Sequence, residues 1–395
     1  MGFQCAKVIK IILANRMQGQ NKVLGSRLFS NFAGVTKSPQ RYSRWQAILI
    51  LYVIKMKQRR SRHSFALIST IVVAALVAVW FLFFSSFISK GEHSYIYIDN
   101  DDTADSVAVK LSKGGARQMV GYRLMATVVG YGGKVKTGRY EIGNGISTFS
   151  LVRNLRNGRQ APVELTIASI RTVEDLAGKL SKQLEADSLA FLNVLRDESE
   201  CRKFGLNTQT ISSIFLPNTY EIYWNTTPEQ LLKRMKKESD AFWTDGRKAK
   251  AMAAGLTPVE VITLASIVDQ ETANNAEKPD IAGMYLNRLH IGMKLQADPT
   301  VKFALKDFSI RRIMHEHLTA ASPYNTYRNK GLPPGPICIP SLSSIEAVLN
   351  YRHHNYIYMC AKEDFSGTHN FAETYDEHLQ NAKRYADALN KRGIK

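Results

Sequence analysis

The chain has 395 residues, 45% of them hydrophobic, and a formal net charge of +19. That length allows two or three domains with ordinary apolar cores. Residues 1–63 carry 13 Lys or Arg and no Asp or Glu, which leaves a net charge of only +6 on the other 332 residues. The basic excess is therefore an N-terminal feature, and it excludes a generally basic, nucleic-acid-binding body.

Residues 65–88 form an uncharged apolar stretch of 24 residues, long enough to cross a hydrocarbon core of about 30 Å as a helix. Basic residues flank it on the N-terminal side, and acidic residues follow it. The positive-inside rule then places the N-terminus in the cytoplasm and everything after about residue 90 outside. We predict a basic cytoplasmic segment over residues 1–64 and a single transmembrane helix over residues 65–88.

Residues 1–55 fit no clear structural element, whereas Met56 opens a short basic leader directly before the apolar stretch. We therefore expect translation to start at Met56, with residues 1–55 an over-long gene start. Mass spectrometry of the intact protein tests this expectation.

Cysteine spacing indicates no metal centre. Cys5, Cys201, Cys338 and Cys360 show no metal-ligand pattern, and we predict no metal and no cofactor. Outside the membrane Cys338 and Cys360 could form a disulfide, or both could remain free buried thiols.

A small α+β region is predicted over residues 92–200. The pattern indicates a strand at 95–98 and helices at 105–112 and 116–129, followed by a strand–helix–strand–helix unit at 138–142, 147–155, 162–168 and 173–184. A further helix is predicted at 189–204. The remaining residues, 205–395, are predicted to form a second, mixed α/β domain, with helices at 228–243, 343–349 and 375–391 and a strand at 356–361. Ser343 and Glu346 form a capping box that is expected to start the second of these helices.

The stretch 257–271 predicts a capped helix that carries a chemically distinctive carboxyl group. Thr257 and Glu260 form a capping box around Pro258. Glu271 follows Val268, Ile267 and Leu264 by three, four and seven residues, which places it on the apolar stripe. Burial raises the pKa of a carboxyl group, as a general acid requires. The alternative is a structural Glu at the helix end, paired with Lys or Arg.

Several motifs resemble those of the membrane-bound endolytic murein (lytic) transglycosylases, the MltG/YceG-like family. The strongest are LASIVDQET at residues 264–272, NRL at 287–289 and GMKLQADPT at 292–300. Further matches are FLPNTYEIY at 215–223, SPYNTY at 322–327, GLPPGPI at 331–337 and GTHNF at 367–371. The family usually has Glu where this chain has Asp269, so Asp269 and Glu271 compete for the role of the acid. We choose Glu271 for its place on the apolar stripe and before Thr272.

The resemblance implies an α+β fold with a LysM-like region over residues 92–200 and a transglycosylase catalytic domain over residues 205–395 with a lysozyme-like, acid-bearing helix. It implies lytic cleavage of the β-1,4 bond between N-acetylmuramic acid and N-acetylglucosamine in nascent peptidoglycan strands, closing a 1,6-anhydro ring and limiting strand elongation. It implies residence in the bacterial plasma (inner) membrane, with the catalytic domain periplasmic, beside peptidoglycan synthases or division proteins.

The resemblance also implies the site residues. Glu271 is expected to be the catalytic acid and base. The residues expected to orient the glycan are Gln296, Asp298, Tyr324 and Asn325, with Thr219, Tyr220 and Glu221 further out.

Two other functions stay open at this point. A hydrolytic muramidase would use Glu271 as acid with Asp269 or Glu221 as a second carboxylate. A non-enzymatic wall-binding scaffold of the division or elongation machinery would cleave nothing.

Overall fold

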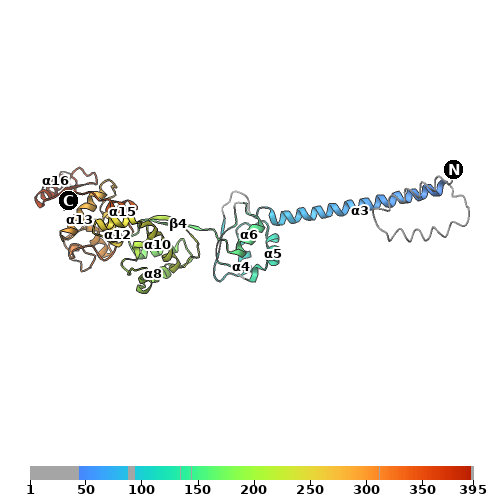
Figure 1. Cartoon of the computed structure of the whole chain (residues 1–395), viewed down its shortest axis with the longest axis horizontal. Helices are drawn as coiled ribbons and strands as arrows, with labels where there is room; N and C mark the ends of the chain where they lie inside the picture. Colours follow the sequence, from blue (N-terminus) through green and yellow to red (C-terminus); the bar gives the residue numbers. More distant parts are fainter. Residues whose placement is uncertain (1–43, 88–93, 134, 144, 311, 393–395) are drawn as a thin grey trace. The chain divides into compact units, whose positions relative to one another are not determined.

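The computed structural model describes residues 44–87, 94–133, 135–143, 145–310 and 312–392 (Figure 1). The first compact unit ends at Val79 and the second runs from Trp80 to Lys395. Helix α3, Arg44–Phe84, opens the described part of the chain. Most of the residues expected to be an over-long start, 1–43, lie outside the described part.

Part of helix α3 could span a membrane. Residues Leu51–Phe84 are long and apolar enough for it, and none of the most apolar window is buried against protein. The predicted C-terminal bound at residue 88 is wrong, because the helix ends at Phe84. Phe87 is fully buried in the core that follows, and its backbone N–H donates to the carbonyl of Ile146 at 2.7 Å. The apolar run thus contains both the end of an exposed apolar helix and the first core residue of the next domain.

The first core follows directly, over residues 87–155. Strand β1, Tyr95–Ile98, pairs antiparallel with β2, Gly138–Glu141. Between them lie helices α4, Ala104–Lys113, and α5, Met119–Val128, with a short 3₁₀ turn at Tyr131–Gly133; α6, Thr148–Asn157, follows β2. The predicted elements are present with ends shifted by a few residues, but β2 pairs with β1 and not with the next strand.

The second core lies over residues 163–235. Strand β3, Val163–Ile167, pairs antiparallel with β4, Asn218–Ile222. The helices are α7, Val173–Ser181; α8, Ser188–Arg196; α9, Glu198–Arg202; and α10, Pro228–Phe242, with a 3₁₀ turn at Ile211–Ile214. The β3–β4 pairing joins residues on either side of the predicted domain boundary near residue 200.

The single helix predicted at 189–204 is wrong, because the chain forms α8 and α9 with Asp197 between them. Asp197 has an extended backbone, and its carboxylate accepts bonds from the N–H groups of Ser199 and Glu200. An Asp that caps a new helix in this way interrupts the preceding one, since its side chain competes for the backbone.

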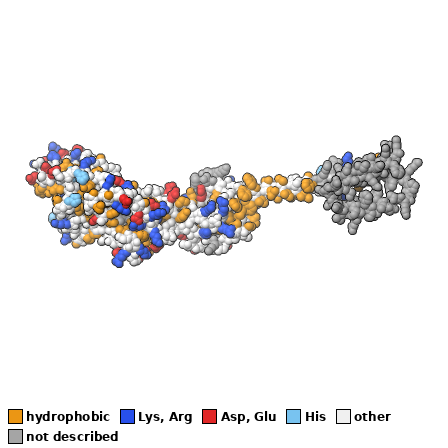
Figure 2. All heavy atoms as spheres, viewed as in Figure 1, with side chains coloured by type: hydrophobic (Ala, Val, Ile, Leu, Met, Phe, Trp, Pro, Cys, Tyr) orange, Lys and Arg blue, Asp and Glu red, His pale blue; other side chains and the backbone are white. Residues whose placement is uncertain are grey.

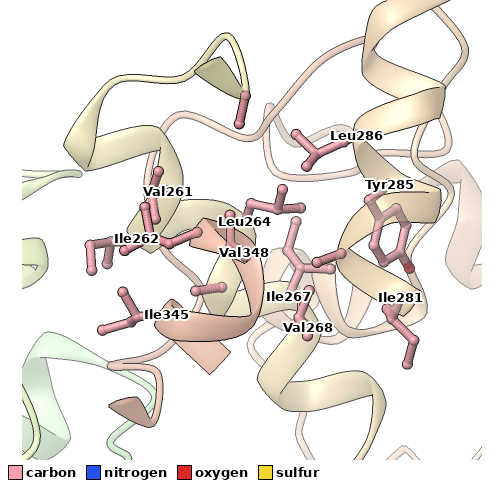
Figure 3. Packing of buried hydrophobic residues seen from close by; sticks show 14 of the residues in the cluster. Val261, Ile262, Leu264, Ile267, Val268, Ile281, Tyr285, Leu286, Ile345 and Val348 are labelled. Atoms are coloured by element: carbon pink, nitrogen blue, oxygen red, sulfur yellow. The ribbon is translucent and has the colours of Figure 1, made fainter. Parts of the chain in front are cut away.

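The third core is built around α12, Pro258–Glu271. Helices α13, Lys278–His290, and α15, Leu342–Leu349, pack against it, and their apolar side chains interlock with those of α12 (Figure 3). The other elements are α11, Asp245–Ala253; α14, Asp298–Leu305; a 3₁₀ turn at His317–Thr319; strands β5, Tyr358–Ala361, and β6, His369–Ala372, which pair antiparallel; and α16, Tyr375–Lys391.

The second and third cores exchange residues. Leu216, just before β4, is buried in the third core. Ile339, which follows the Pro- and Gly-rich loop of residues 331–337, is buried in the second core, and its N–H donates to the carbonyl of Ile170 at 2.8 Å. The mixed α+β character predicted from the sequence is confirmed.

Two smaller expectations change. Helix α15 is capped by Ser341, whose hydroxyl accepts from the N–H of Ser344, and not by the predicted Ser343. Cys338 and Cys360 are both free thiols, so the disulfide alternative is wrong. Cys338 is buried behind α12, close to the amide of Gln270.

Candidate active site

Glu271 is the last residue of α12, and a single neighbour defines its geometry. Its Oε1 accepts a hydrogen bond of 2.6 Å from the hydroxyl of Tyr285, on α13. Residues 261–268 of α12 are all buried, so this helix is covered on every side and not along one stripe. The feature that distinguishes Glu271 is therefore its place where the buried helix ends, beside Tyr285, a fully buried tyrosine whose ring belongs to the core (Figure 3).

The electrostatic surroundings of Glu271 favour the protonated form. Burial of the carboxyl is the largest effect and raises its pKa to about 7. The Tyr285 hydrogen bond and the charges of His369 and Arg288 act in the opposite direction, while the negative charge of Asp298 raises the pKa further. The residue as a whole is half-buried, while its carboxyl group is the part that burial affects most.

Asp269, two residues earlier, has the opposite surroundings. Burial alone would raise the pKa of its carboxyl, but hydrogen bonds from Ser341 and Ser344 and the charge of Lys278 outweigh it and lower that pKa. Lys278 Nζ lies 3.2 Å from Asp269 Oδ1, and both side chains are almost fully buried. Asp269 is thus an ionised carboxylate that joins α12 to α13 and α15.

The segment 295–300 carries two predicted glycan contacts next to Glu271. Gln296 has a positive φ of 51°, a conformation that costs a non-glycine residue energy. Its side chain is exposed, while its backbone N–H donates to the carbonyl of Thr326 at 3.2 Å. Asp298 is also exposed, and the hydroxyl of Tyr327 donates to its Oδ1 at 2.6 Å.

Arg288 holds this segment from behind. Its guanidinium donates to the carbonyl of Leu295 at 2.6 Å and to that of Ile357 at 2.5 Å, and it lies over the ring of Tyr358. Burial lowers the pKa of the guanidinium without removing its charge. One buried arginine therefore fixes both the strained segment and the chain leading into β5.

A buried carboxylate–histidine pair completes the group. Glu277, just before α13, accepts from the backbone N–H of His369 at 2.6 Å and lies 3.0 Å from His369 Nδ1. The pair places the start of β6 near Glu271, whose pKa His369 influences.

The other predicted contacts lie in different surroundings. Asn325 is fully buried, and its amide donates to the carbonyls of Leu318 and Ala320 at 2.9 Å, so it is committed to folding its own loop. The ring of Tyr324 packs on Phe303, with centroids 4.7 Å apart, and burial raises the pKa of its hydroxyl to about 12.

The predicted outer contacts lie on strand β4. Tyr220 points into the second core and donates to the carbonyl of Leu216 at 2.8 Å. Thr219 and Glu221 lie on the exposed face of the β3–β4 pair, opposite Thr166 and Glu164. The hydrogen bonds of Thr219 and Tyr220 stay within the second core and the adjoining strand, and none reaches the group around Glu271.

A cavity of about 430 Å³ lies elsewhere, around the N-terminal part of α12. Glu260, His290 and Pro334 line it, whereas Glu271, Gln296 and Tyr324 do not. Glu271 is eleven residues further along the helix than Glu260, which at the usual helical rise is about 16 Å. The end of α12 is nevertheless the candidate site, because the pKa of Glu271 is raised there and the negative charge of Asp298 acts on it.

Sequence reasoning did not select five residues that surround Glu271: Tyr285, Arg288, Tyr327, Glu277 and His369. Arg288, Tyr327 and His369 lie inside motifs that were recognised, but a motif does not say which member points inward. Tyr285 follows Glu271 by fourteen residues across a helix break, so no helical spacing connects them. Only the packing of α13 on α12 brings the two side chains together.

The chain is similar to several known proteins. The profile of the YceG-like family matches residues 96–384. The endolytic murein transglycosylase of Bacillus subtilis (strain 168) is 26% identical over 276 residues, covering 65% of this chain and 75% of that protein. The chain spans about half the length of the endolytic murein transglycosylase of Streptococcus pneumoniae (strain ATCC BAA-255 / R6): the two are 27% identical over 289 residues, 64% of this chain and 51% of that protein. A solved yceG-like protein from Listeria monocytogenes has a TM-score of 0.49 and 24% identity, over 73% of this chain and 98% of that one.

Proposed function

This chain belongs to the YceG-like family, and from that premise we propose that it is an endolytic murein transglycosylase, which cuts glycan strands of peptidoglycan within the strand. Two relatives carry that name. The observation that carries the proposal here is the Glu271 carboxyl, whose pKa is raised to about 7 and whose Oε1 accepts from Tyr285. A carboxyl group that titrates near neutral pH serves both as acid and as base.

The proposed reaction needs one carboxyl group. Protonated Glu271 gives its proton to the oxygen between the N-acetylmuramic acid and the N-acetylglucosamine, and the C1–O bond breaks. The resulting glutamate then accepts the proton of the muramyl C6 hydroxyl as that oxygen attacks C1. The products are a 1,6-anhydro-muramyl end and a free N-acetylglucosamine hydroxyl, with Glu271 protonated again. Tyr285 stabilises the ionised intermediate state by its hydrogen bond.

The surrounding side chains are proposed to hold the glycan and its developing charge. Asp298 places a negative charge near a sugar that becomes positive at C1. Gln296 and Tyr324 orient the sugars, and the strain at Gln296 is typical of a functional position. Asn325 and Tyr220 act as positioning residues for the loops that carry these contacts. Thr219 and Glu221 on the exposed face of β4 are proposed as outer contacts for a longer strand.

The proposal includes an anchor. Helix α3 crosses the bacterial inner membrane once, with the N-terminus in the cytoplasm and the folded part on the periplasmic side, as the basic flank indicates. The region 92–200 is proposed to be LysM-like and to bind the wall, and peptidoglycan synthases or division proteins are proposed as partners. Anchoring confines cleavage to the wall layer nearest the bilayer, which suits a role in limiting new strands.

The decisive experiment uses the full-length protein, purified in detergent, on nascent glycan strands. We expect Glu271→Gln to reduce the cleavage rate by about 10²–10⁴-fold, the usual contribution of a general acid. Tyr375→Phe, on the exposed surface of α16, is the matched control and should cleave like the wild type. Unchanged cleavage by Glu271→Gln would remove this residue from the mechanism.

The reaction product distinguishes a lytic transglycosylase from a hydrolytic muramidase. Mass spectrometry should find anhydro-muramyl ends, whereas a hydrolase would give reducing ends. The hydrolytic alternative needs a second carboxylate, and Asp269 is poorly suited because Lys278, Ser341 and Ser344 already occupy it. Absence of any cleavage by the wild-type protein would instead favour the scaffold.

A further inference from the structure

We propose that helix α5 forms a second membrane contact, lying flat in the outer headgroup region beside the point where α3 leaves the bilayer. The inference rests on the proposed anchoring by α3 and goes beyond it, because it assigns a lipid-binding surface to the folded domain. We call Val120, Leu124, Val128 and Phe149 the juxtamembrane face.

The juxtamembrane face is apolar and unusually open. Val120, Leu124 and Val128 recur every four residues on one side of α5 and are 71%, 51% and 77% exposed. The other side of α5 is buried, with Tyr122 in the first core. Removing aliphatic side chains of this size from water lowers the free energy. An exposed row of them is therefore typical of a surface that binds a membrane or another molecule.

Contacts with the end of α3 place this face beside the membrane exit. A Cβ on Gly121 would lie 2.4 Å from the carbonyl oxygen of Leu82, so only glycine lets α5 approach the last turn of α3 this closely. The N–H of Arg117 donates to the carbonyl of Phe87 at 3.0 Å, and Gln118 Nε2 donates to Ser85 Oγ at 3.2 Å. Helix α5 is therefore held against the residues where the apolar helix ends.

Aromatic side chains extend the apolar surface across this junction. The rings of Phe84 and Phe149 stack with centroids 5.6 Å apart, and both are partly exposed. Figure 2 shows hydrophobic side chains gathered on the surface of the part that carries α5 and α6. Aromatic rings concentrate at the headgroup level of membranes.

Charge favours a lipid surface over a protein partner. Residues 106–163 contain ten Lys or Arg and a single acidic residue, Glu141. Arg117, Arg123 and Arg153 are exposed near the juxtamembrane face, and Arg153 lies over the Phe149 ring. An apolar row bordered by basic side chains is typical of helices that lie in the interface of membranes with anionic lipids.

The test places the photoreactive amino acid benzoylphenylalanine at Leu124 of the full-length protein in vesicles of phosphatidylethanolamine and phosphatidylglycerol. The control position is Leu189 on α8, which is similarly exposed, at 61%. We expect lipid adducts by mass spectrometry at position 124 and none at position 189. Adducts only to protein, adducts at both positions or adducts at neither would overturn the proposal.

A second variant checks that the apolar row is the cause. With the probe at Phe149, the triple change Val120→Ser, Leu124→Ser and Val128→Ser should reduce the yield of lipid adducts severalfold, and an unchanged yield would contradict the proposal. Alkaline carbonate extraction distinguishes a failure of the proposed anchoring by α3 from a failure of the proposed contact by α5. If the protein leaves the membrane, the anchoring by α3 fails; if it stays but position 124 gives no lipid adduct, only the second contact fails.

Discussion

At the scale of single residues, two carboxyl groups two positions apart are driven in opposite directions by their neighbours. Asp269 has three polar partners that favour its charge, and the pKa of its carboxyl is lowered. Glu271 is buried with one tyrosine as hydrogen-bond donor, and its pKa is raised to about 7. Such opposite surroundings fit the roles proposed for the two groups, a structural carboxylate at Asp269 and a general acid at Glu271.

Tyr285→Phe should move the pH dependence of cleavage upward. The hydroxyl stabilises the ionised form of Glu271, so its loss raises the pKa of that carboxyl further. Because the acid must be protonated in the free enzyme, the alkaline limb of the kcat/KM profile should shift to higher pH. The profile is measured on purified glycan strands, with Tyr375→Phe as control. A limb that moves to lower pH would contradict this account of the pair.

Glu271→Gln should stabilise the fold at about pH 8 and have little effect at about pH 4. The folded pKa, about 7, lies above the usual value of 4.5, so folding favours the protonated form and the fold loses stability as pH rises from the lower value through the higher one. Glutamine removes this penalty, which we expect to be about 1–3 kcal/mol. Thermal unfolding midpoints at the two pH values test it, and a decrease at the higher pH would show that the buried charge is well compensated.

Asp269→Ala should destabilise the protein strongly, by about 3–5 kcal/mol, because it leaves the buried Lys278 without its charged partner. Adding Lys278→Met should recover much of that loss. The Asp269 contribution is present above the unfolded pKa near 3.8 and disappears as pH falls through the lower folded pKa. Equal destabilisation of the single and double variants in thermal unfolding would show that the pair is not coupled.

At the scale of elements, the site depends on how closely α13 approaches its neighbours. A Cβ on Gly283 would lie 2.4 Å from the carbonyl oxygen of Arg352. Next to it, Asn287 donates to the carbonyls of His354 and Tyr356 at 2.7 and 2.9 Å. These contacts hold α13, which carries Tyr285 and Arg288, against the chain that leads to β5 and β6.

Gly283→Ala should therefore cost about 1–3 kcal/mol of stability and reduce activity, because the backbone of residue 352 has to move. The matched control is Gly178→Ala in α7, where no atom lies within 4 Å of the added methyl group. That change should be neutral or stabilise the helix by up to about 1 kcal/mol. Similar midpoint shifts for the two variants in thermal unfolding would argue against close packing at residue 283.

Local sequence patterns predicted most helices and strands. Their exact ends and the partners of their side chains depend on contacts between residues far apart in the sequence. The capping box of α12 identified the start of that helix, since its two bonds join residues only three positions apart. The predicted cap of α15 lies two residues too late, because Ser343 has Glu346 three residues on and matches the capping-box pattern, whereas the actual cap, Ser341, also bonds Asp269 and Lys278 on other helices. Glu271 lies in a motif that can be read from the sequence, whereas its hydrogen-bond partner Tyr285 depends on helix packing that no local pattern reports.

At the scale of the whole molecule, the proposed topology makes a direct prediction. Alkaline phosphatase is active only outside the cytoplasm, so fusion after residue 395 should be active and fusion after residue 63 inactive. The basic flank before α3 is the physical reason, since positive charges are retained on the cytoplasmic side. The reverse pattern of activities would invert the proposed orientation and place Glu271 on the side without peptidoglycan.

The exchange of Leu216 and Ile339 between two cores has a practical consequence. A protease nick between α9 and the 3₁₀ turn at residues 211–214 would cut the covalent link, yet β3 would remain paired with β4 and Ile170 with Ile339. The two pieces should therefore co-purify, and separately expressed halves that end and begin there should reassemble by complementation. A shortened protein that begins at residue 205 would instead expose the bare edge of β4 and invite aggregation.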